Sequence, residues 1–168
     1  MRLFFALWPP AKTAHALARW THEVTHDSGG TPTPSDSIHL TLAFLGEADP
    51  GKAYNAAQRV QGARHALPID QAQYWKHNKI VWVGPQAMPA SLAALVNQLH
   101  GSLREHGFVL EDRPFAAHVT LLRKAKPPKS LPPLPSVEWP VHEMLLVRSR
   151  TSPKGSTYEP VERFPLRA

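Results

Sequence analysis

The chain has 168 residues, of which 42% are hydrophobic and 19% are charged, and this balance fits one compact domain with an apolar core. It contains no cysteine, which excludes disulfides, cysteine-based zinc sites and cysteine nucleophiles. The net charge of +6 favours an anionic partner, although a merely solvated basic surface is equally compatible with it. The apolar run over residues 3–8 is too short for a secretory signal or a membrane span, so we expect a soluble protein without a membrane partner. The absence of cysteine suits the cytoplasm, where we expect the protein to act.

The first half of the chain alternates between apolar strands and helices. Residues 2–8 consist of an arginine and a six-residue apolar run that ends at two prolines, which predicts a buried strand. Residues 9–30 place apolar side chains at helical spacing before a Gly-Gly pair, which predicts a helix of about four turns. A loop over residues 31–37 leads to an alternating segment, residues 38–46, that predicts a strand. The alanine-rich residues 49–67 predict a second helix.

The second half of the chain repeats this alternation. Its predicted elements are strands at 68–75 and 80–83, a helix at 88–107, a strand at 115–124, and two final strands at 141–150 and 156–166. Residues 125–140 hold six of the eighteen prolines and predict an extended, exposed loop. Each half contributes strands and at least one helix. We therefore expect one domain over residues 1–168 with an α+β fold that is bilobal and pseudo-symmetric, two sheets facing a central cleft and helices on the outside.

A tetrapeptide of the form His, aliphatic, Thr, aliphatic occurs twice, once starting at His39 and once starting at His118. By composition, two chance occurrences have a probability of about one in two hundred. Alternate side chains of a strand share a face, so His39 and Thr41 point to one side of their strand, and His118 and Thr120 do the same. Packing explains the aliphatic positions but not a histidine on the opposite face. We therefore interpret the four His and Thr residues as functional.

Two histidines and two threonines that face each other across a cleft suit acid–base chemistry on an anion. One neutral imidazole can take a proton from water while a protonated imidazole gives one to a leaving oxygen. Threonine hydroxyls, with a cation, can hold the oxygens of an anion that gains charge in the transition state. This combination predicts metal-free phosphodiester cleavage. A metal site is the weaker interpretation, because His22 and His26 have helical spacing but no third ligand is indicated.

The segments RLFFAL, IHLTLAFLG, FAAHVTLLRK and YEPVERFPL resemble the 2H phosphoesterases, specifically the bacterial and archaeal RNA 2′,3′-cyclic phosphodiesterases, also called LigT-like or 2′-5′ RNA ligase-like proteins. The resemblance covers almost the whole chain. It implies a bilobal α+β fold with both motifs on central strands facing one cleft, and no metal or other cofactor. One departure is Ala117, which stands where the family usually carries proline before the second motif histidine. This departure concerns backbone rigidity and leaves the chemistry intact.

The resemblance also implies a role for each site residue. His39 and His118 are the expected catalytic residues, with His39 protonating the leaving oxygen and His118 activating water. Thr41, Thr120 and Arg123 are expected to bind the phosphate oxygens. The near-symmetry of the two motifs means that the residues alone do not decide which histidine is the acid.

Arg123 and Phe44 each follow a motif threonine by three residues. Phe44 matches a family aromatic residue that can stack on a base. Strand alternation, however, places both side chains on the face opposite to the threonines. Arg123 would then need a bend or a strand end to reach the phosphate, and Phe44 would belong to the core. Trp82 and Tyr158 are further candidates for the base pocket.

These expectations combine into an enzyme that hydrolyses the terminal 2′,3′-cyclic phosphate of RNA to a 2′-phosphate. Its expected partners are RNA or oligonucleotide ends with that group and small cyclic nucleotides, and a monomer suffices because one chain carries both motifs. Two alternatives remain open. The same site could join RNA ends through a 2′-5′ linkage, by microscopic reversibility, or the chain could be a nucleotide- or RNA-binding module that has lost turnover.

Overall fold

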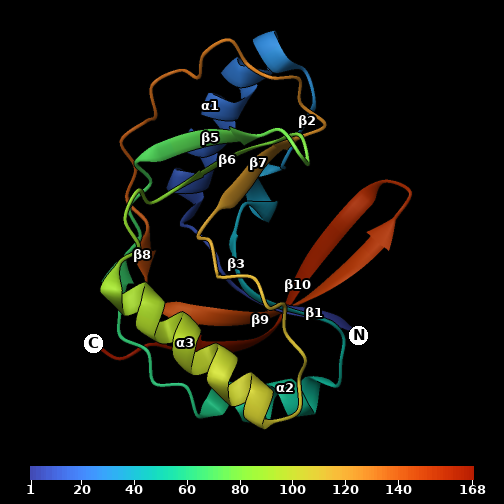
Figure 1. The fold of residues 1–168 in the computed structure, drawn as a ribbon, viewed down its shortest axis with the longest axis vertical. Coiled ribbons are helices and arrows are strands. Elements are labelled where there is room, and N and C mark those ends of the chain that lie inside the picture. The colour runs from blue at the N-terminus through green and yellow to red at the C-terminus, as the bar shows by residue number, and fades with distance from the viewer.

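Two four-stranded antiparallel sheets form the frame of the structure (Figure 1). The computed structural model describes all residues, Met1–Ala168. The first sheet has the order β10-β9-β1-β3 and consists of β1 (Arg2–Leu7), β3 (Leu40–Glu47), β9 (Glu143–Ser152) and β10 (Gly155–Pro165). The second has the order β2-β7-β6-β5 and consists of β2 (Thr31–Pro32), β5 (Gln71–Trp75), β6 (Ile80–Gly84) and β7 (Val119–Arg123). A separate pair joins β4 (His65–Ala66) to β8 (Pro140–Val141).

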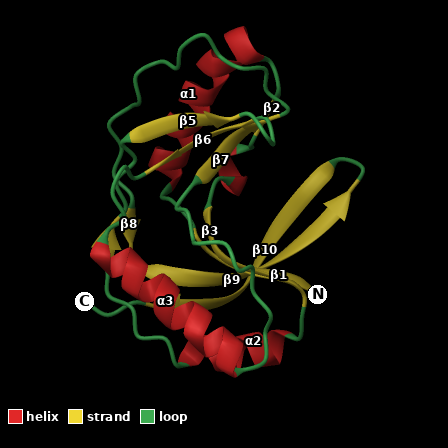
Figure 2. Cartoon of the chain, in the orientation of Figure 1, coloured by secondary structure: helices red, strands yellow, loops and turns green.

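The helices lie outside the two sheets (Figure 2). Helix α1 (Ala11–Ser28) follows β1 of the first sheet but packs against β2 and β7 of the second. Helix α3 (Ala90–Glu105) follows β6 of the second sheet but packs against β3 of the first, beside α2 (Pro50–Gln58). The loop before β3 contains a 3-10 turn, η1 (Ser35–Ser37). Because the chain exchanges helices between the sheets, one continuous cluster of 32 buried residues connects both lobes. The expected two-sheet α+β arrangement is confirmed.

The second helix is shorter than the sequence pattern predicted. It was expected over residues 49–67 but ends at Gln58. The residues that follow pair with the C-terminus instead: the Arg64 N–H donates to the Arg167 carbonyl at 2.7 Å, and the Arg167 N–H donates to the Gly62 carbonyl at 2.9 Å. Tertiary pairing therefore overrides the helical propensity of this alanine-rich stretch.

The proline-rich segment over residues 125–140 is extended, as predicted, but only partly exposed. Its carbonyl at Pro132 accepts a hydrogen bond from Trp20 Nε1 on α1 at 3.0 Å. Trp139 is fully buried, and Leu131 and Leu134 pack against the core. The expectation of an exposed loop is wrong for these apolar side chains, since prolines fix the backbone without deciding which way the residues between them point.

Candidate active site

The first motif lies on β3, which is the edge strand of the first sheet, so the central position implied by the resemblance is wrong for this motif. This strand contains a β-bulge. The register with β1 passes from Thr41 to Ala43 and leaves Leu42 without a partner. Leu42 and Ala43 are consequently both buried, and Phe44 returns to the face of Thr41. Phe44 is 52% exposed, so the core position that strict alternation predicted for it is wrong.

Strand β7 has the same irregularity at the same place in the second motif. The register with β6 passes from Thr120 to Leu122 and leaves Leu121 without a partner. Both leucines are fully buried, and Arg123 returns to the face of Thr120. The opposite face predicted by strict alternation is therefore wrong for Arg123 as well, and the bulge supplies the bend that its reach requires.

Each bulge is tied to a segment outside its own strand pair. The carbonyl of Leu42 accepts a hydrogen bond from His100 Nε2 on α3 at 2.8 Å. The carbonyl of Leu121 accepts one from the backbone N–H of Thr33 at 2.9 Å. A buried carbonyl left without a partner costs about 1–3 kcal/mol, so these bonds stabilise the bulged backbone.

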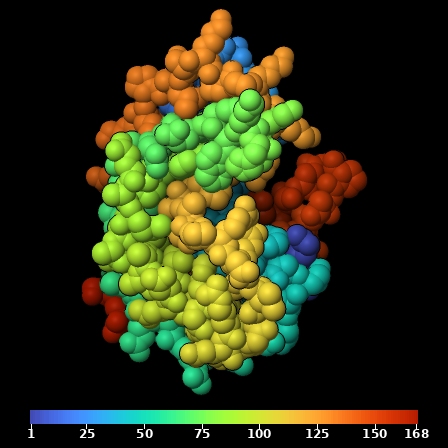
Figure 3. Space-filling view, viewed as in Figure 1, coloured from blue at the N-terminus to red at the C-terminus, as the bar shows by residue number.

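The two bulged strands face one cleft with a volume of about 620 Å³, which opens between the body of the molecule and the β9–β10 hairpin (Figure 3). The six residues expected from the sequence to form a site all line it: His39, Thr41, Phe44, His118, Thr120 and Arg123. No carboxylate lines this cleft, whereas Arg2, Arg123 and Lys154 do. None of these three cations forms a salt bridge. The cleft is therefore electrostatically suited to an anion.

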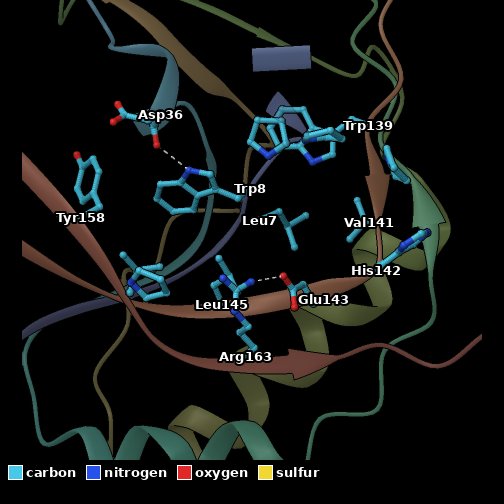
Figure 4. Close-up of a pocket in the computed structure, with 15 residues that line it drawn as sticks. Leu7, Trp8, Asp36, Trp139, Val141, His142, Glu143, Leu145, Tyr158 and Arg163 are labelled. Carbon is cyan, nitrogen blue, oxygen red and sulfur yellow. Dashed lines mark hydrogen bonds and ion pairs between the residues drawn. The ribbon is translucent and has the colours of Figure 1, made fainter. Parts of the chain in front are cut away.

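His39 immediately precedes β3 and is packed among aromatic rings. The indole of Trp8 lies nearly parallel to the imidazole, with ring centroids 4.6 Å apart and planes 13° apart. The rings of Phe4 and Tyr158 each lie 5.2 Å from it. Trp8 is fixed in turn by a hydrogen bond from its Nε1 to the carbonyl of Asp36 at 2.9 Å (Figure 4). These contacts hold the imidazole in one plane.

Trp8 and Tyr158 also line a second cavity, with a volume of about 470 Å³, shown in Figure 4. An ion pair between Arg163 and Glu143, 2.5 Å long, lies at its wall. Neither motif histidine lines this cavity. Trp8 and Tyr158 thus lie between this cavity and His39, and both motif histidines line the other cleft.

His118 immediately precedes β7 and has its own aromatic neighbours. The ring of Trp75 on β5 lies 4.8 Å from the imidazole. Trp82 on β6 meets it edge-on at 6.2 Å. Trp82 is only 7% exposed and does not line the cleft, whereas Tyr158 does. Of the two further aromatic candidates from the sequence, the structure brings only Tyr158 to the cleft.

The two motif histidines have the same hydrogen-bonding arrangement. Nδ1 of His39 lies 2.7 Å from the carbonyl of Ser37, and Nδ1 of His118 lies 2.9 Å from the carbonyl of Ala116. A carbonyl can only accept a hydrogen bond, so Nδ1 carries a hydrogen in both residues. Nε2 is then the nitrogen of each ring that can accept or donate a proton in the cleft.

The surroundings of His39 favour its neutral form. Burial lowers the pKa of His39 from 6.5 to about 4, and electrostatic interactions with Arg123 and His118 act in the same direction. The hydrogen bond to the Ser37 carbonyl opposes this change. In the free protein at neutral pH, His39 is therefore an uncharged imidazole beside a cationic cleft.

Sequence reasoning missed three residues that support the motifs. Trp8 and Trp75 form the aromatic walls of the two histidines, and His100 holds the bulge in β3. Trp8 ends an apolar run and Trp75 ends a predicted strand, so neither local pattern distinguishes a place beside a catalytic histidine from an ordinary strand position. His100 lies on α3, fifty-eight residues from Leu42, and no local pattern indicates the contact.

His22 and His26, weighed from the sequence as a metal pair, lie together on α1 with ring centroids 5.3 Å apart. No group of three or more His, Cys, Asp or Glu side chains is placed to hold a metal ion. A survey of the helices finds none with the length and apolar character needed to cross a membrane.

Two sheets that each present a His-x-Thr motif to one cleft without carboxylates define the class of two-histidine phosphoesterases. The chain belongs to the LigT-like phosphoesterases within this class, as comparison with known proteins shows. Residues 7–82 match the family model described as LigT like Phosphoesterase. The resemblance inferred from the four sequence segments is thereby confirmed.

Similar proteins cover almost the entire chain. The RNA 2′,3′-cyclic phosphodiesterase of Escherichia coli is 35% identical, with 98% of this chain and 96% of the relative aligned. The protein of the same name from Thermus thermophilus is 33% identical, with 99% of this chain and 91% of the relative aligned. The crystal structure of E. coli LigT in apo form superposes with a TM-score of 0.90 at 32% identity, covering 99% of this chain and 98% of that one.

Proposed function

We propose that this protein is a metal-independent RNA 2′,3′-cyclic phosphodiesterase that converts a terminal 2′,3′-cyclic phosphate to a 2′-phosphate. One observation carries the proposal: His39 and His118 line one cationic cleft, each with Nδ1 bound to a carbonyl and Nε2 left for proton transfer. The names of the relatives support the reaction. A structure of E. coli LigT complexed with 3′-AMP, with a TM-score of 0.90, supports a nucleotide ligand.

In the proposed reaction, His118 Nε2 takes a proton from water as the water oxygen attacks phosphorus. The bond between phosphorus and the 3′ oxygen breaks, and His39 Nε2 gives its proton to that oxygen. The 2′ oxygen keeps the phosphate. His118 is then protonated and His39 is neutral, and exchange with solvent restores the starting state of both. General acid–base catalysis of this kind contributes on the order of 10² to 10⁴ in rate.

His39 must be protonated to act as the acid, although its pKa is about 4 in the free cleft. The substrate resolves this conflict, because its phosphate brings a negative charge next to the imidazole and raises the pKa of His39. Binding is then coupled to proton uptake. Titration calorimetry with an unreactive nucleotide phosphate, in buffers of different ionisation enthalpy, measures the number of protons taken up on binding. We expect uptake near neutral pH in the wild type and none in His39→Asn.

The other residues of the cleft bind the substrate in this proposal. Thr41, Thr120 and Arg123 hold the non-bridging phosphate oxygens, which gain negative charge in the transition state. Phe44 stacks on the terminal base, because its ring is exposed in the cleft. The guanidinium carbon of Arg2 lies 5.4 Å from the centroid of this ring and helps to hold it in place. All of these side chains belong to one chain, which supports a monomeric enzyme. We further propose that it acts on cytoplasmic RNA.

A chromatographic assay on a short RNA with a 2′,3′-cyclic end tests the proposal. We expect a 2′-phosphate product, full activity in excess EDTA and loss of activity in His118→Ala. Loss of activity in EDTA would indicate a metalloenzyme. Adding a second RNA with a free 5′-hydroxyl measures ligation in the same reaction, and dominant 2′-5′ joining would overturn hydrolysis as the main activity. Tight nucleotide binding without turnover would indicate a binding module.

A further inference from the structure

The outer part of the β9–β10 hairpin is an isolated arm beside the cleft. Strand β9 pairs with β1 only as far as Ser149, opposite Arg2. Beyond that point, the strands pair only with each other, up to the turn before Gly155. In Figure 1 the outer part of this hairpin projects beyond the other strands of the first sheet, and in Figure 3 it stands apart from the body of the molecule. We call residues 149–158 the arm.

One face of the arm lines the cleft, and the other face points away from it. Thr151 pairs with Ser156, and Ser149 pairs with Tyr158; all four residues line the cleft. Lys154, in the turn, lines it as well. Arg150 pairs with Thr157 between these two pairs. Because side chains alternate across a strand, Arg150 lies on the face away from the cleft, and it is absent from the cleft lining.

The cleft face of the arm has the chemistry of a phosphate-backbone contact. It carries hydroxyls from Ser149, Thr151 and Ser156, the ammonium of Lys154 and no carboxylate. Lys154 is exposed and forms no salt bridge, so its charge is free for a ligand. Hydroxyls and lysines are common donors to phosphate and sugar oxygens in nucleic-acid complexes. From Ser149 to Ser152 the arm spans roughly 10 Å, beyond the two histidines.

We propose that the cleft face of the arm binds the ribose-phosphate chain of the RNA on the 5′ side of the cyclic phosphate. This inference rests on the proposed function, because it assumes a terminal cyclic phosphate between His39 and His118. The 2′ and 3′ oxygens of the terminal nucleoside both belong to the cyclic phosphate. The rest of the RNA is therefore attached to this nucleoside through its 5′ oxygen. A cyclic mononucleotide therefore fills the floor of the cleft without reaching Lys154, whereas an oligonucleotide contacts it. The arm thus makes the enzyme prefer RNA ends over free cyclic nucleotides.

Steady-state kinetics on two substrates tests this inference. The substrates are a 2′,3′-cyclic mononucleotide and an RNA oligonucleotide that ends in the same cyclic nucleotide. We expect Lys154→Ala to lower kcat/KM about five- to tenfold for the oligonucleotide and by less than about twofold for the mononucleotide. Arg150→Ala is the matched control, since it removes the same charge from the same hairpin on the other face. We expect it to change neither substrate by more than about twofold.

The outcomes separate the arm from the proposed function. If the wild type hydrolyses neither substrate, the proposed function fails. If the wild type hydrolyses both substrates but Lys154→Ala changes kcat/KM equally for both, or for neither, the arm does not bind the ribose-phosphate chain of the RNA. Equal losses in Lys154→Ala and Arg150→Ala would indicate attraction by overall charge and would overturn a contact on one face. A Ser149→Ala, Thr151→Ala double variant, which keeps the charge, should also lose oligonucleotide preference.

Discussion

The indole of Trp8 and the imidazole of His39 lie almost parallel, with centroids 4.6 Å apart and planes 13° apart. This stacking covers one face of the histidine and contributes to the burial that lowers its pKa to about 4. Trp8 is itself fixed by its hydrogen bond to the Asp36 carbonyl. Trp8, the residue directly after β1, therefore helps to orient the imidazole of the first motif and to keep it uncharged.

Replacing Trp8 by leucine should raise the pKa of His39, because water would then reach one face of the imidazole. NMR titration of the histidine resonances measures this change directly. Trp8→Phe is the control, since it keeps an aromatic face and should retain most of the lowered pKa. An unchanged pKa in Trp8→Leu would mean that other neighbours alone bury His39.

The stability of the protein should depend on the pH through His39. Its pKa is lowered in the folded state, so the stabilisation is complete above the unfolded value near 6.5 and is lost as the pH falls towards 4. The loss is on the order of 2–3 kcal/mol over this window. Urea unfolding of the wild type and of His39→Asn at several pH values tests this, because His39→Asn should lose less stability on acidification. Parallel curves for the two proteins would contradict it.

Removing the His100 imidazole should disturb the bulge of the first motif. His100→Leu leaves the Leu42 carbonyl without its donor and should cost about 1–3 kcal/mol in the free energy of unfolding. It should also lower kcat, because the same bulge brings Phe44 to the face of Thr41. His100→Gln restores an N–H donor and should recover part of both losses. Full activity in His100→Leu would show that the bulge forms without this bond.

Gly84 supports the segment that carries His118. A Cβ at this position would lie 2.6 Å from the Ala117 carbonyl oxygen, which is part of the backbone and must move. We expect Gly84→Ala to destabilise the protein by about 1–3 kcal/mol and to lower activity. Gly101→Ala on α3 is the matched control, because a Cβ there meets nothing within 4 Å and should stabilise the helix by about 0.5–1 kcal/mol. Thermal unfolding of both variants gives the comparison.

Alternation along a strand was enough to predict which residues of each motif face the cleft. His39, Thr41, His118 and Thr120 line it, while Leu40 and Val119 are fully buried. These relationships are local, because they depend only on the period of a strand. The expected sheets and outer helices follow from the same kind of local pattern.

Alternation failed at the residue three positions after each threonine. Phe44 and Arg123 reach the cleft because a bulge intervenes, and each bulge is held by a distant residue, His100 or Thr33. The aromatic wall beside His39 likewise comes from other parts of the chain, Trp8 directly after β1 and Tyr158 on β10. Such contacts depend on how the elements pack, so no short stretch of sequence indicates them.

The central claim, that His39 and His118 act as one catalytic unit, is tested most directly by kcat/KM on an RNA with a 2′,3′-cyclic end. The measurement compares the wild type, His39→Ala, His118→Ala and the double variant. Each single change should reduce the rate on the order of 10² to 10⁴, and the double variant should be little slower than the slower single variant, since neither histidine completes the reaction alone. Wild-type activity in His39→Ala, or losses that multiply in the double variant, would contradict the account.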